Sequence, residues 1–180
     1  MTIFTIGHST RPIEEFLALL RGHGVRRLVD VRTVPRSRHN PQFGADALAP
    51  ALERAGIAYL HLPGLGGLRH PSPGSINTGW RNRSFRGYAD HMQSGAFAES
   101  LQRCLELAAE SPLALMCAEA VPWRCHRSLI ADALLVRGIE VLEIVSPTAA
   151  RPHTLTSFAK VSGTTVTYPA PGPPLLPDVD

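Results

Sequence analysis

The chain reads LALMCAEAVPWRCHRSLI from residue 113 to residue 130, and this stretch decides its fold. Residues 113–116 form a compact apolar run, which is typical of a strand buried on both faces. The loop that follows contains Cys117 and Cys125. After this loop, apolar residues recur at helical spacing: Leu129, Ile130, Ala133 and Leu134. Strand, loop and helix in this order predict one unit of an α/β fold.

The same order repeats along the chain. Four more apolar runs predict strands, at residues 2–6, 27–31, 57–60 and 140–145. Helical spacing predicts helices at residues 12–23, 45–55, 85–92 and 96–110. Helices between strands indicate right-handed crossovers and parallel pairing. We therefore expect an α/β fold with a mostly parallel sheet of about five strands and helices on both faces, in three layers.

A single domain should hold this sheet. The length of 180 residues is usual for one domain, and 44% hydrophobic residues suffice for a core. We assign residues 1–146 to the α/β domain. Residues 147–180 contain seven prolines, so we expect a loosely packed Pro-rich C-terminal tail there. The loop at residues 69–84 exceeds ordinary connection lengths and predicts a functional flap or a mobile segment.

Composition and termini indicate a cytoplasmic protein with reduced thiols. The chain has three cysteines, an odd number, and no basic leader with a cleavage site. A disulfide framework is therefore not expected. No apolar run approaches the roughly 18 residues of a membrane span, so we expect no membrane partner. Cys104 falls on the apolar face of a predicted helix and is assigned to the core.

Arginine supplies nearly all of the positive charge. The net charge is +3, and Lys160 is the only lysine. Residues 21–39 contain six arginines against the single acid Asp30, and residues 55–89 contain four arginines and no acid. Arginine suits planar recognition of phosphate or carboxylate, although a GC-rich genome also favours its codons. These two segments predict an anionic small molecule or nucleotide as partner, with nucleic acid as the alternative.

Polar residues follow four of the predicted strands. His8 and Ser9 follow the first, Asp30 and Arg32 the second, His61 and a glycine-rich loop the third, and Cys117 with Glu119 the fourth. In parallel sheets, ligands bind beyond the carboxyl ends of the strands. We therefore expect these residues to gather around one site.

The chemistry of that site depends on two thiols. Cys117 ends a strand, and Cys125 and His126 lie where the next helix begins. A helix N-terminus with neighbouring arginines lowers a thiol pKa and favours a nucleophile or a metal ligand. The alternative for Cys117 is an ordinary buried thiol. For His126, the alternatives are a base, a metal ligand or a helix-start residue. Glu119 could act as an acid or base, or pair with an arginine.

Two familiar kinds of site are disfavoured. Cysteine phosphatases place an arginine six residues after the cysteine, where this chain has Trp123, and Arg124 comes one residue too late. Cys117 and Cys125 are eight residues apart, unlike the spacing of two to four residues in familiar zinc sites. We therefore assign no metal ligands, and the cofactor stays unknown.

Several ordered motifs resemble one family. They are Gly7-His8-Ser9, Asp30-Val31-Arg32 with Pro35, Ser37 and Arg38, Leu65-Gly66-Gly67, Tyr88-Ala89, and Cys117-Ala118-Glu119 followed by Cys125-His126-Arg127. Together they resemble the bacterial family called domain of unknown function 488, over roughly residues 3–145. The resemblance implies a compact cytoplasmic α/β domain. It marks His8, Ser9, Asp30, Arg32, Ser37, Arg38, Gly66, Gly67, Cys117, Glu119, Cys125, His126 and Arg127 as positions of the family pattern, and implies no reaction.

Three functional hypotheses follow. The first is an enzyme, a cysteine-dependent transferase or hydrolase, that acts on a phosphorylated or nucleotide-like substrate. Its catalytic residues would be Cys117, Glu119, Cys125 and His126. Its substrate-binding residues would be His8, Ser9, Asp30, Arg32, Ser37, Arg38, Gly66, Gly67, Tyr88 and Arg127. The second is a nucleic-acid or nucleotide binding module. The third is a thiol redox or metal-responsive protein.

Overall fold

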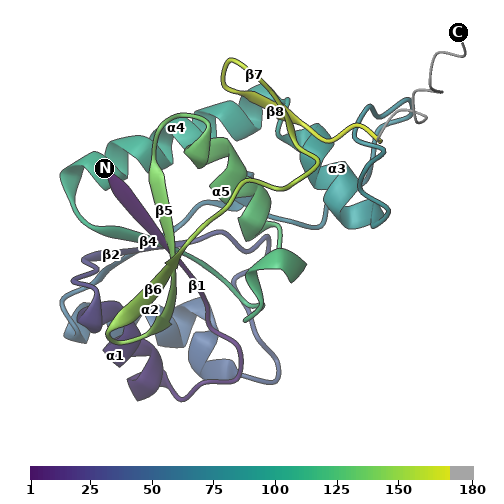
Figure 1. The fold of residues 1–180 in the computed structure, drawn as a ribbon. Coiled ribbons are helices and arrows are strands. Elements are labelled where there is room, and N and C mark those ends of the chain that lie inside the picture. Colours follow the sequence, from purple (N-terminus) through teal and green to yellow (C-terminus); the bar gives the residue numbers. More distant parts are fainter. Residues whose placement is uncertain (171–180) are drawn as a thin grey trace, which may run out of the picture.

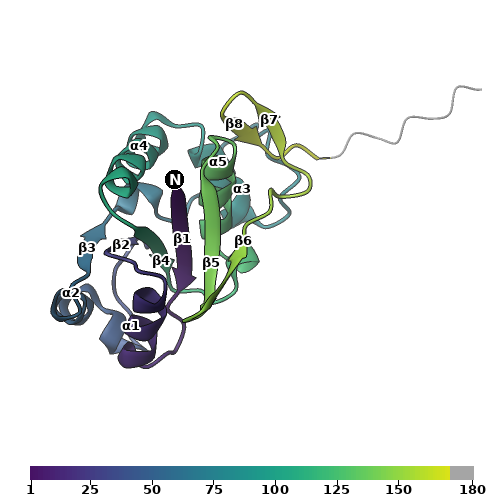
Figure 2. The same cartoon turned by 60° about the vertical axis from the view of Figure 1, so that its left-hand side comes forward.

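A six-stranded sheet forms the centre of the molecule in the computed structural model, which describes residues 1–170 (Figures 1 and 2). Its strands are β1 (Thr2–Gly7), β2 (Arg27–Asp30), β3 (Ala58–His61), β4 (Leu113–Cys117), β5 (Glu140–Ser146) and β6 (Ala149–Pro152). They lie in the order β3-β2-β4-β1-β5-β6. All neighbours are parallel except β5 and β6. The expected mostly parallel α/β sheet is confirmed, with β6 as an additional antiparallel edge strand.

Helices cover both faces of the sheet. They are α1 (Ile13–Gly22), α2 (Ala45–Arg54), α3 (Arg83–His91), α4 (Gly95–Glu110) and α5 (Arg127–Leu135). Three short 3-10 helices, Pro41–Phe43, Pro63–Leu65 and Pro122–Arg124, each begin with proline. Figure 1 shows α1 and α2 on one side of the sheet and α4 and α5 on the other. This is the expected three-layer arrangement.

Strand β4 shows why the sequence contains an uninterrupted apolar run. Leu115 and Cys117 belong to the core under α4 and α5, whereas Ala114 and Met116 belong to the core under α1 and α2. All five residues of β4 are buried. A central strand with a helix layer on each face must be apolar at every position.

The course of the chain changes direction at the carboxyl end of β4. The chain leaves β1 and β2 toward α1 and α2, but leaves β4 toward α5 on the opposite face. Strand β4 lies between β1 and β2. Neighbouring loops that diverge in this way open a binding crevice beyond the strand ends in α/β sheets. Cys117 is the last residue of β4 and lies at this point.

Residues 147–170 differ from the loosely packed tail that the prolines predicted. They contain β6 and a hairpin of β7 (Lys160–Ser162) and β8 (Thr165–Thr167). Tyr168 is fully buried, and its hydroxyl donates a hydrogen bond of 2.8 Å to the Asp132 carboxylate. The short β-branched runs and this buried tyrosine outweigh the scattered prolines. The proline-rich residues 171–177 lie outside the described residues.

The long loop before α3 is held in place by one carboxylate. Asp90 accepts hydrogen bonds from the Ser72 backbone at 2.8 Å, the Ser75 hydroxyl at 2.6 Å and the Asn77 amide at 2.7 Å. Asn77 is fully buried and accepts a hydrogen bond from the backbone of Tyr168. The segment predicted as a flap is thus tied to α3 and to the C-terminal strands. Within residues 1–170, no helix combines the length and apolar character that crossing a membrane requires.

Candidate functional site

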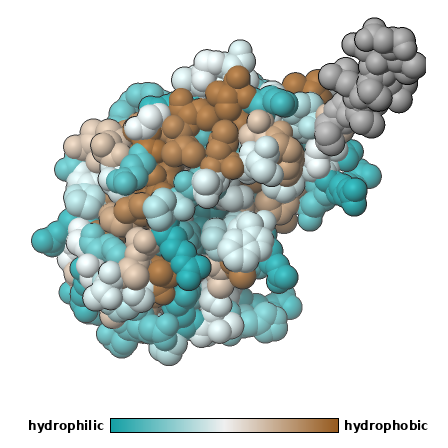
Figure 3. Space-filling model, viewed as in Figure 1, coloured by the Kyte–Doolittle hydropathy of each residue, from teal (hydrophilic) through white to brown (hydrophobic). Residues whose placement is uncertain are grey.

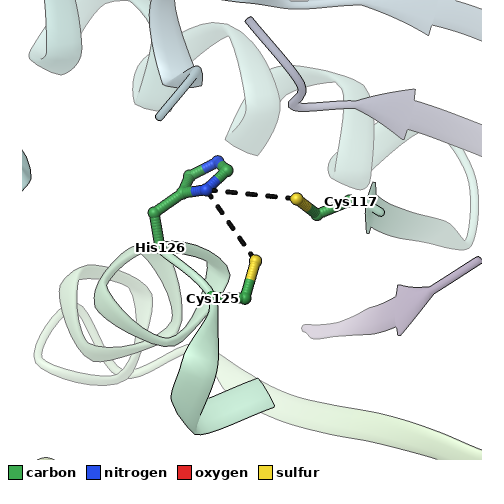
Figure 4. A group of neighbouring side chains, drawn as sticks. All are labelled: Cys117, Cys125 and His126. Atoms are coloured by element: carbon green, nitrogen blue, oxygen red, sulfur yellow. Dashed lines mark hydrogen bonds between the residues drawn. The ribbon is translucent and has the colours of Figure 1, made fainter. Parts of the chain in front are cut away.

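Cys117, Cys125 and His126 meet at the carboxyl end of β4 and form a group that we call the Cys–Cys–His cluster (Figure 4). The His126 Nδ1 atom lies 4.0 Å from Cys117 Sγ and 3.8 Å from Cys125 Sγ. The two sulfurs and this nitrogen all lie within 4.8 Å of one another. The structure therefore brings together three side chains that the sequence assigned to one site.

Backbone contacts bring β1 and the loop after β4 together. The backbone N–H groups of His8 and Ser9 donate to the carbonyls of Cys117 and Ala118, both at 2.9 Å. Gly7 permits this approach, since a Cβ atom there would lie 1.9 Å from the carbonyl oxygen of Glu119. Cys125 follows the last 3-10 helix, and His126 is the residue that precedes α5.

The orientation of His126 is set by a backbone carbonyl. Its Nε2 atom lies 3.0 Å from the carbonyl oxygen of Val31. A carbonyl only accepts, so Nε2 carries a proton, and in the neutral ring Nδ1 presents its lone pair to the two thiols. The Tyr88 ring packs on the imidazole with centroids 5.0 Å apart. A Cβ at Gly67 would lie 2.9 Å from Nδ1, so this glycine makes room for the ring.

The two thiols of the cluster have opposite pKa shifts. The hydrogen bond from the Cys125 thiol, together with His126 and Arg127, holds the pKa of Cys117 well below its ordinary value despite burial. The same hydrogen bond raises the pKa of Cys125, because its acceptor Cys117 carries the negative charge. Burial adds to this effect. By contrast, burial alone raises the pKa of the core residue Cys104 to about 12. The cluster therefore stabilises one thiolate.

Arg127 joins the cluster to a buried carboxylate. It is 1% exposed, and its Nη1 donates to the Glu119 carbonyl at 3.0 Å while its Nη2 donates to Glu143 at 2.9 Å. Its backbone N–H donates to Cys125 Sγ at 3.4 Å. Glu143 also accepts a hydrogen bond from the Thr5 hydroxyl. Burial raises the pKa of Glu143 although Arg127 opposes this shift.

Arg32 and Asp30 form a buried ion pair beside the cluster. Asp30 accepts from Arg32 Nε at 2.9 Å and from the Tyr59 hydroxyl at 2.8 Å. Arg32 Nη2 also donates to the Phe43 carbonyl at 2.8 Å, and Nη1 lies 3.3 Å from His8 Nε2. Burial lowers the pKa of His8, and the nearby Arg32 charge adds to this shift. These contacts engage the guanidinium that the sequence assigned to substrate binding.

Several other residues of the predicted site make local contacts or are exposed. Glu119 is exposed, and its carboxylate accepts from the Val121 backbone at 3.0 Å. The Ser37 hydroxyl accepts from the Asn40 backbone at 3.1 Å, and Arg38 is exposed. Ser9 occupies the left-handed region, with φ of 52°. Gly66 packs against Thr33 and Pro63, while Gly67 and Tyr88 contact His126 directly.

Three residues that contribute to the site were not predicted from the sequence. Val31 acts through its backbone, so its side chain gives no signal of this contact. Thr5 and Glu143 each place a polar side chain on the α5 side of a strand, among residues that were interpreted as apolar strands. A polar residue among apolar neighbours in each strand was the only sign of these two residues in the sequence.

The donor atoms of the cluster suit a metal ion. Tetrahedral zinc, with bonds of about 2.3 Å to sulfur and 2.0 Å to nitrogen, places those atoms about 3.5 Å apart. The observed separations of 3.8 and 4.0 Å require only a small contraction. The Val31 carbonyl holds the second ring nitrogen, as outer partners of metal-binding histidines do. The eight-residue spacing of the two cysteines argued against such a site. Spacing along the chain does not, however, show which side chains meet in space.

Comparison with known proteins gives one match. A family model described as "Domain of unknown function DUF488" matches residues 12–134 of this chain. No curated protein and no solved structure matches the chain significantly.

Proposed function

Since the chain belongs to the family described as domain of unknown function DUF488, a description that names no reaction, we propose a function from the chemistry of its site. The protein is a thiol-dependent enzyme in which Cys117 is the nucleophile and His126 carries the proton. One observation supports this above all: the hydrogen bond from His126 Nε2 to Val31 leaves Nδ1 facing the two thiols.

The surroundings of Cys117 favour a reactive thiolate. Cationic groups and a thiol donor lower the pKa of this residue, which is the condition for nucleophilic attack at neutral pH. The thiolate would form a bond to an electrophilic centre of the substrate, and the bond from that centre to its leaving group would break. The proton held at His126 would pass to the leaving group. Transfer of the bound group to water or to another acceptor would then release Cys117.

Cys125 and Arg127 act as positioning residues in this proposal. The Cys125 thiol donates to Cys117, and the backbone N–H of Arg127 holds the Cys125 sulfur at 3.4 Å. Arg127 Nη1 lies 4.0 Å from the same sulfur. The donation from the Cys125 thiol favours negative charge at Cys117, whereas the contacts of Arg127 with the Cys125 sulfur act in the opposite direction on the pKa of Cys125.

Alkylation as a function of pH tests the proposal. Intact protein is treated with iodoacetamide between pH 5 and 9, and the labelled cysteine is located by mass spectrometry. Cys117 should react rapidly at pH 6, and Cys104 should not react, because its pKa is raised to about 12 and it is fully buried. Substitution Cys117→Ser should remove the reactive thiolate and its absorbance near 240 nm. Labelling of Cys117 only above pH 8 would refute the proposal.

Metal binding is a second candidate, favoured by the three donor atoms within 4.8 Å of one another. Two thiolates and one imidazole would leave a fourth position open, as in catalytic zinc sites. Cobalt(II) titration would then give thiolate charge-transfer bands that are lost in Cys125→Ser. Zinc would protect both thiols of the cluster from iodoacetamide, and a chelator would restore labelling. The nucleophile proposal predicts rapid labelling of chelator-treated and zinc-exposed protein alike.

Nucleic-acid binding receives less support from the arginines. Arg32 is buried against Asp30, and Arg27 pairs with Glu110 at 2.9 Å. Two of the six arginines of the first cationic segment are thus engaged by carboxylates, and Arg36 and Arg38 are exposed.

A further inference from the structure

A cavity of about 670 Å³ lies beside the Cys–Cys–His cluster. It is bounded by β5 and β6, by residues 120–123 and by the start of α5. Its volume is within the range of about 300–1,000 Å³ that small-molecule sites occupy. Arg127 lines this cavity and also contacts Cys125, whereas the three cluster side chains are not among the lining residues. Figure 3 shows apolar residues gathered over the region of β5 and α5 on this side of the molecule.

The floor of the cavity is a row of polar residues across three strands. Thr5 of β1 pairs in register with Glu143 of β5, and Glu143 pairs with Arg151 of β6. Residues in register project from the same face of a sheet. On this face the neighbouring positions Ile3 and Leu115 are buried in the apolar core. The polar row therefore marks the place where the core ends and the cavity begins.

Glu143 is an unusual residue for this position. Its side chain is 12% exposed and is paired with Arg127, whose side chain is 1% exposed. A buried ion pair is often no more stabilising than apolar residues of similar volume. Its presence on the wall of a cavity is therefore better explained by ligand binding than by stability.

The charges of the cavity favour an anion. Three arginines line it, Arg11, Arg127 and Arg151, against the single carboxylate of Glu143. Arg127 is engaged by Glu143, and Arg11 pairs with Glu15 at 3.4 Å and donates to the Gly7 carbonyl. Arg151 is exposed and takes part in none of the ion pairs within residues 1–170. Arg151 is thus available to a ligand, and its planar fork suits a phosphate or carboxylate.

Both tryptophans of the chain also line the cavity. Trp123 is 71% exposed, which is unusual for so large an apolar side chain, and lies next to Val121 and Pro122. Trp80 packs against Phe85 and Phe158, whose ring centroids lie 4.8 and 4.9 Å from its own. Indole faces bind flat rings by stacking.

We propose that this cavity binds a small organic anion that combines a flat aromatic or heteroaromatic ring with a phosphate or carboxylate group. Arg151 holds the anionic group, and the ring lies against Trp123. This assignment does not depend on nucleophilic chemistry at Cys117, because none of its contacts uses a thiol.

Tryptophan fluorescence tests the assignment directly, because both tryptophans line the cavity. The full chain is titrated with phenyl phosphate, inorganic phosphate and benzyl alcohol, which separate the contributions of ring and charge. Phenyl phosphate should give a saturable change, and the other two probes should bind at least about tenfold more weakly.

Substitutions identify the location of binding. Arg151→Gln should weaken phenyl phosphate binding about tenfold, the loss expected for a charge-assisted hydrogen bond. Arg103→Gln, which changes an exposed arginine on α4, should leave binding unchanged. Cys117→Ser should also leave it unchanged, so that failure of the thiol proposal and failure of this one remain distinguishable. Absence of saturation at millimolar phenyl phosphate would overturn the proposal. Equal affinity in wild type and Arg151→Gln would overturn it as well.

Discussion

The Nε2 atom of His126 lies 3.0 Å from the carbonyl oxygen of Val31, at the end of the neighbouring strand. This contact determines which ring nitrogen faces the thiols. A glutamine at position 126 lacks the ring geometry and the charge that lower the pKa of Cys117. We therefore expect His126→Gln to raise the pKa of Cys117 and to slow its alkylation at pH 6 about tenfold or more. Thiolate absorbance at 240 nm against pH measures the shift. An unchanged titration curve would exclude His126 as the proton partner.

Gly67 should be needed for the position of that ring. A Cβ there would lie 2.9 Å from His126 Nδ1, so Gly67→Ala must displace the imidazole or the loop. We expect slower alkylation of Cys117 in this variant and a destabilisation of about 1–3 kcal/mol. Gly95→Ala is the matched control, because a Cβ at Gly95 meets nothing within 4 Å. If both alanines behave alike, the close packing on His126 has no effect on the cluster.

Asp30 and Arg32 should contribute mainly to stability. Both are buried, and removing one partner leaves the other charge unpaired. We expect Asp30→Asn to lower the free energy of unfolding by about 3–5 kcal/mol, measured by urea denaturation. Arg32→Lys keeps the charge but loses the planar fork, so it should also be destabilising. A loss below about 1 kcal/mol in both variants would restore Arg32 as a candidate for holding the substrate.

The C-terminal strands should stabilise α5 through Tyr168. Its hydroxyl donates to Asp132, which also accepts from His153 at 2.7 Å and from the Thr156 backbone at 3.1 Å. Tyr168→Phe removes one of these donors and should lower stability by about 1–3 kcal/mol. Thermal unfolding should then show a lower Tm by several degrees. An unchanged Tm would mean that the hydrogen bond from Tyr168 to Asp132 contributes little to stability.

Stability should decrease below neutral pH because of His8. Burial lowers the pKa of His8 from 6.5, so the unfolded chain binds a proton there that the folded protein does not. The free energy of unfolding must therefore fall as pH decreases through about 6.5. Urea denaturation at pH 7.5 and 5.5 should show a smaller loss for His8→Asn than for wild type. His39→Asn, at an exposed position, is the control and should retain the full loss.

Periodicity predicted the parts of the fold that bury continuous apolar surface. Strand β4 and helix α5 follow from the run at residues 113–116 and the helical spacing after Arg127, because both elements pack against the core. Strands β7 and β8 have three residues each, too few for their alternation to outweigh nearby prolines. The short edge strand β6 was missed for the same reason.

The candidate site was predictable in location but not in the partners of its charged residues. Chain order brings Cys117 and His126 to the same edge of the sheet, and strand ends are visible in the sequence. The number of arginines, however, does not reveal whether each meets a carboxylate or a ligand. Arg32 meets Asp30 and Arg127 meets Glu143, whereas Arg151, outside the predicted site, takes part in none of the ion pairs found within residues 1–170.

The residues that line the cavity lie partly inside and partly outside the family match. Arg11 precedes the family match at residues 12–134 and Glu143 and Arg151 follow it, whereas Trp123 and Arg127 lie inside it. Glu143 is linked to the cluster through Arg127, but within residues 1–170 Arg151 takes part in no such contact. Exchange of residues 149–156 between two members of the family, with Glu143 kept, should therefore change ligand binding in the cavity and leave the contacts of the Cys–Cys–His cluster in place.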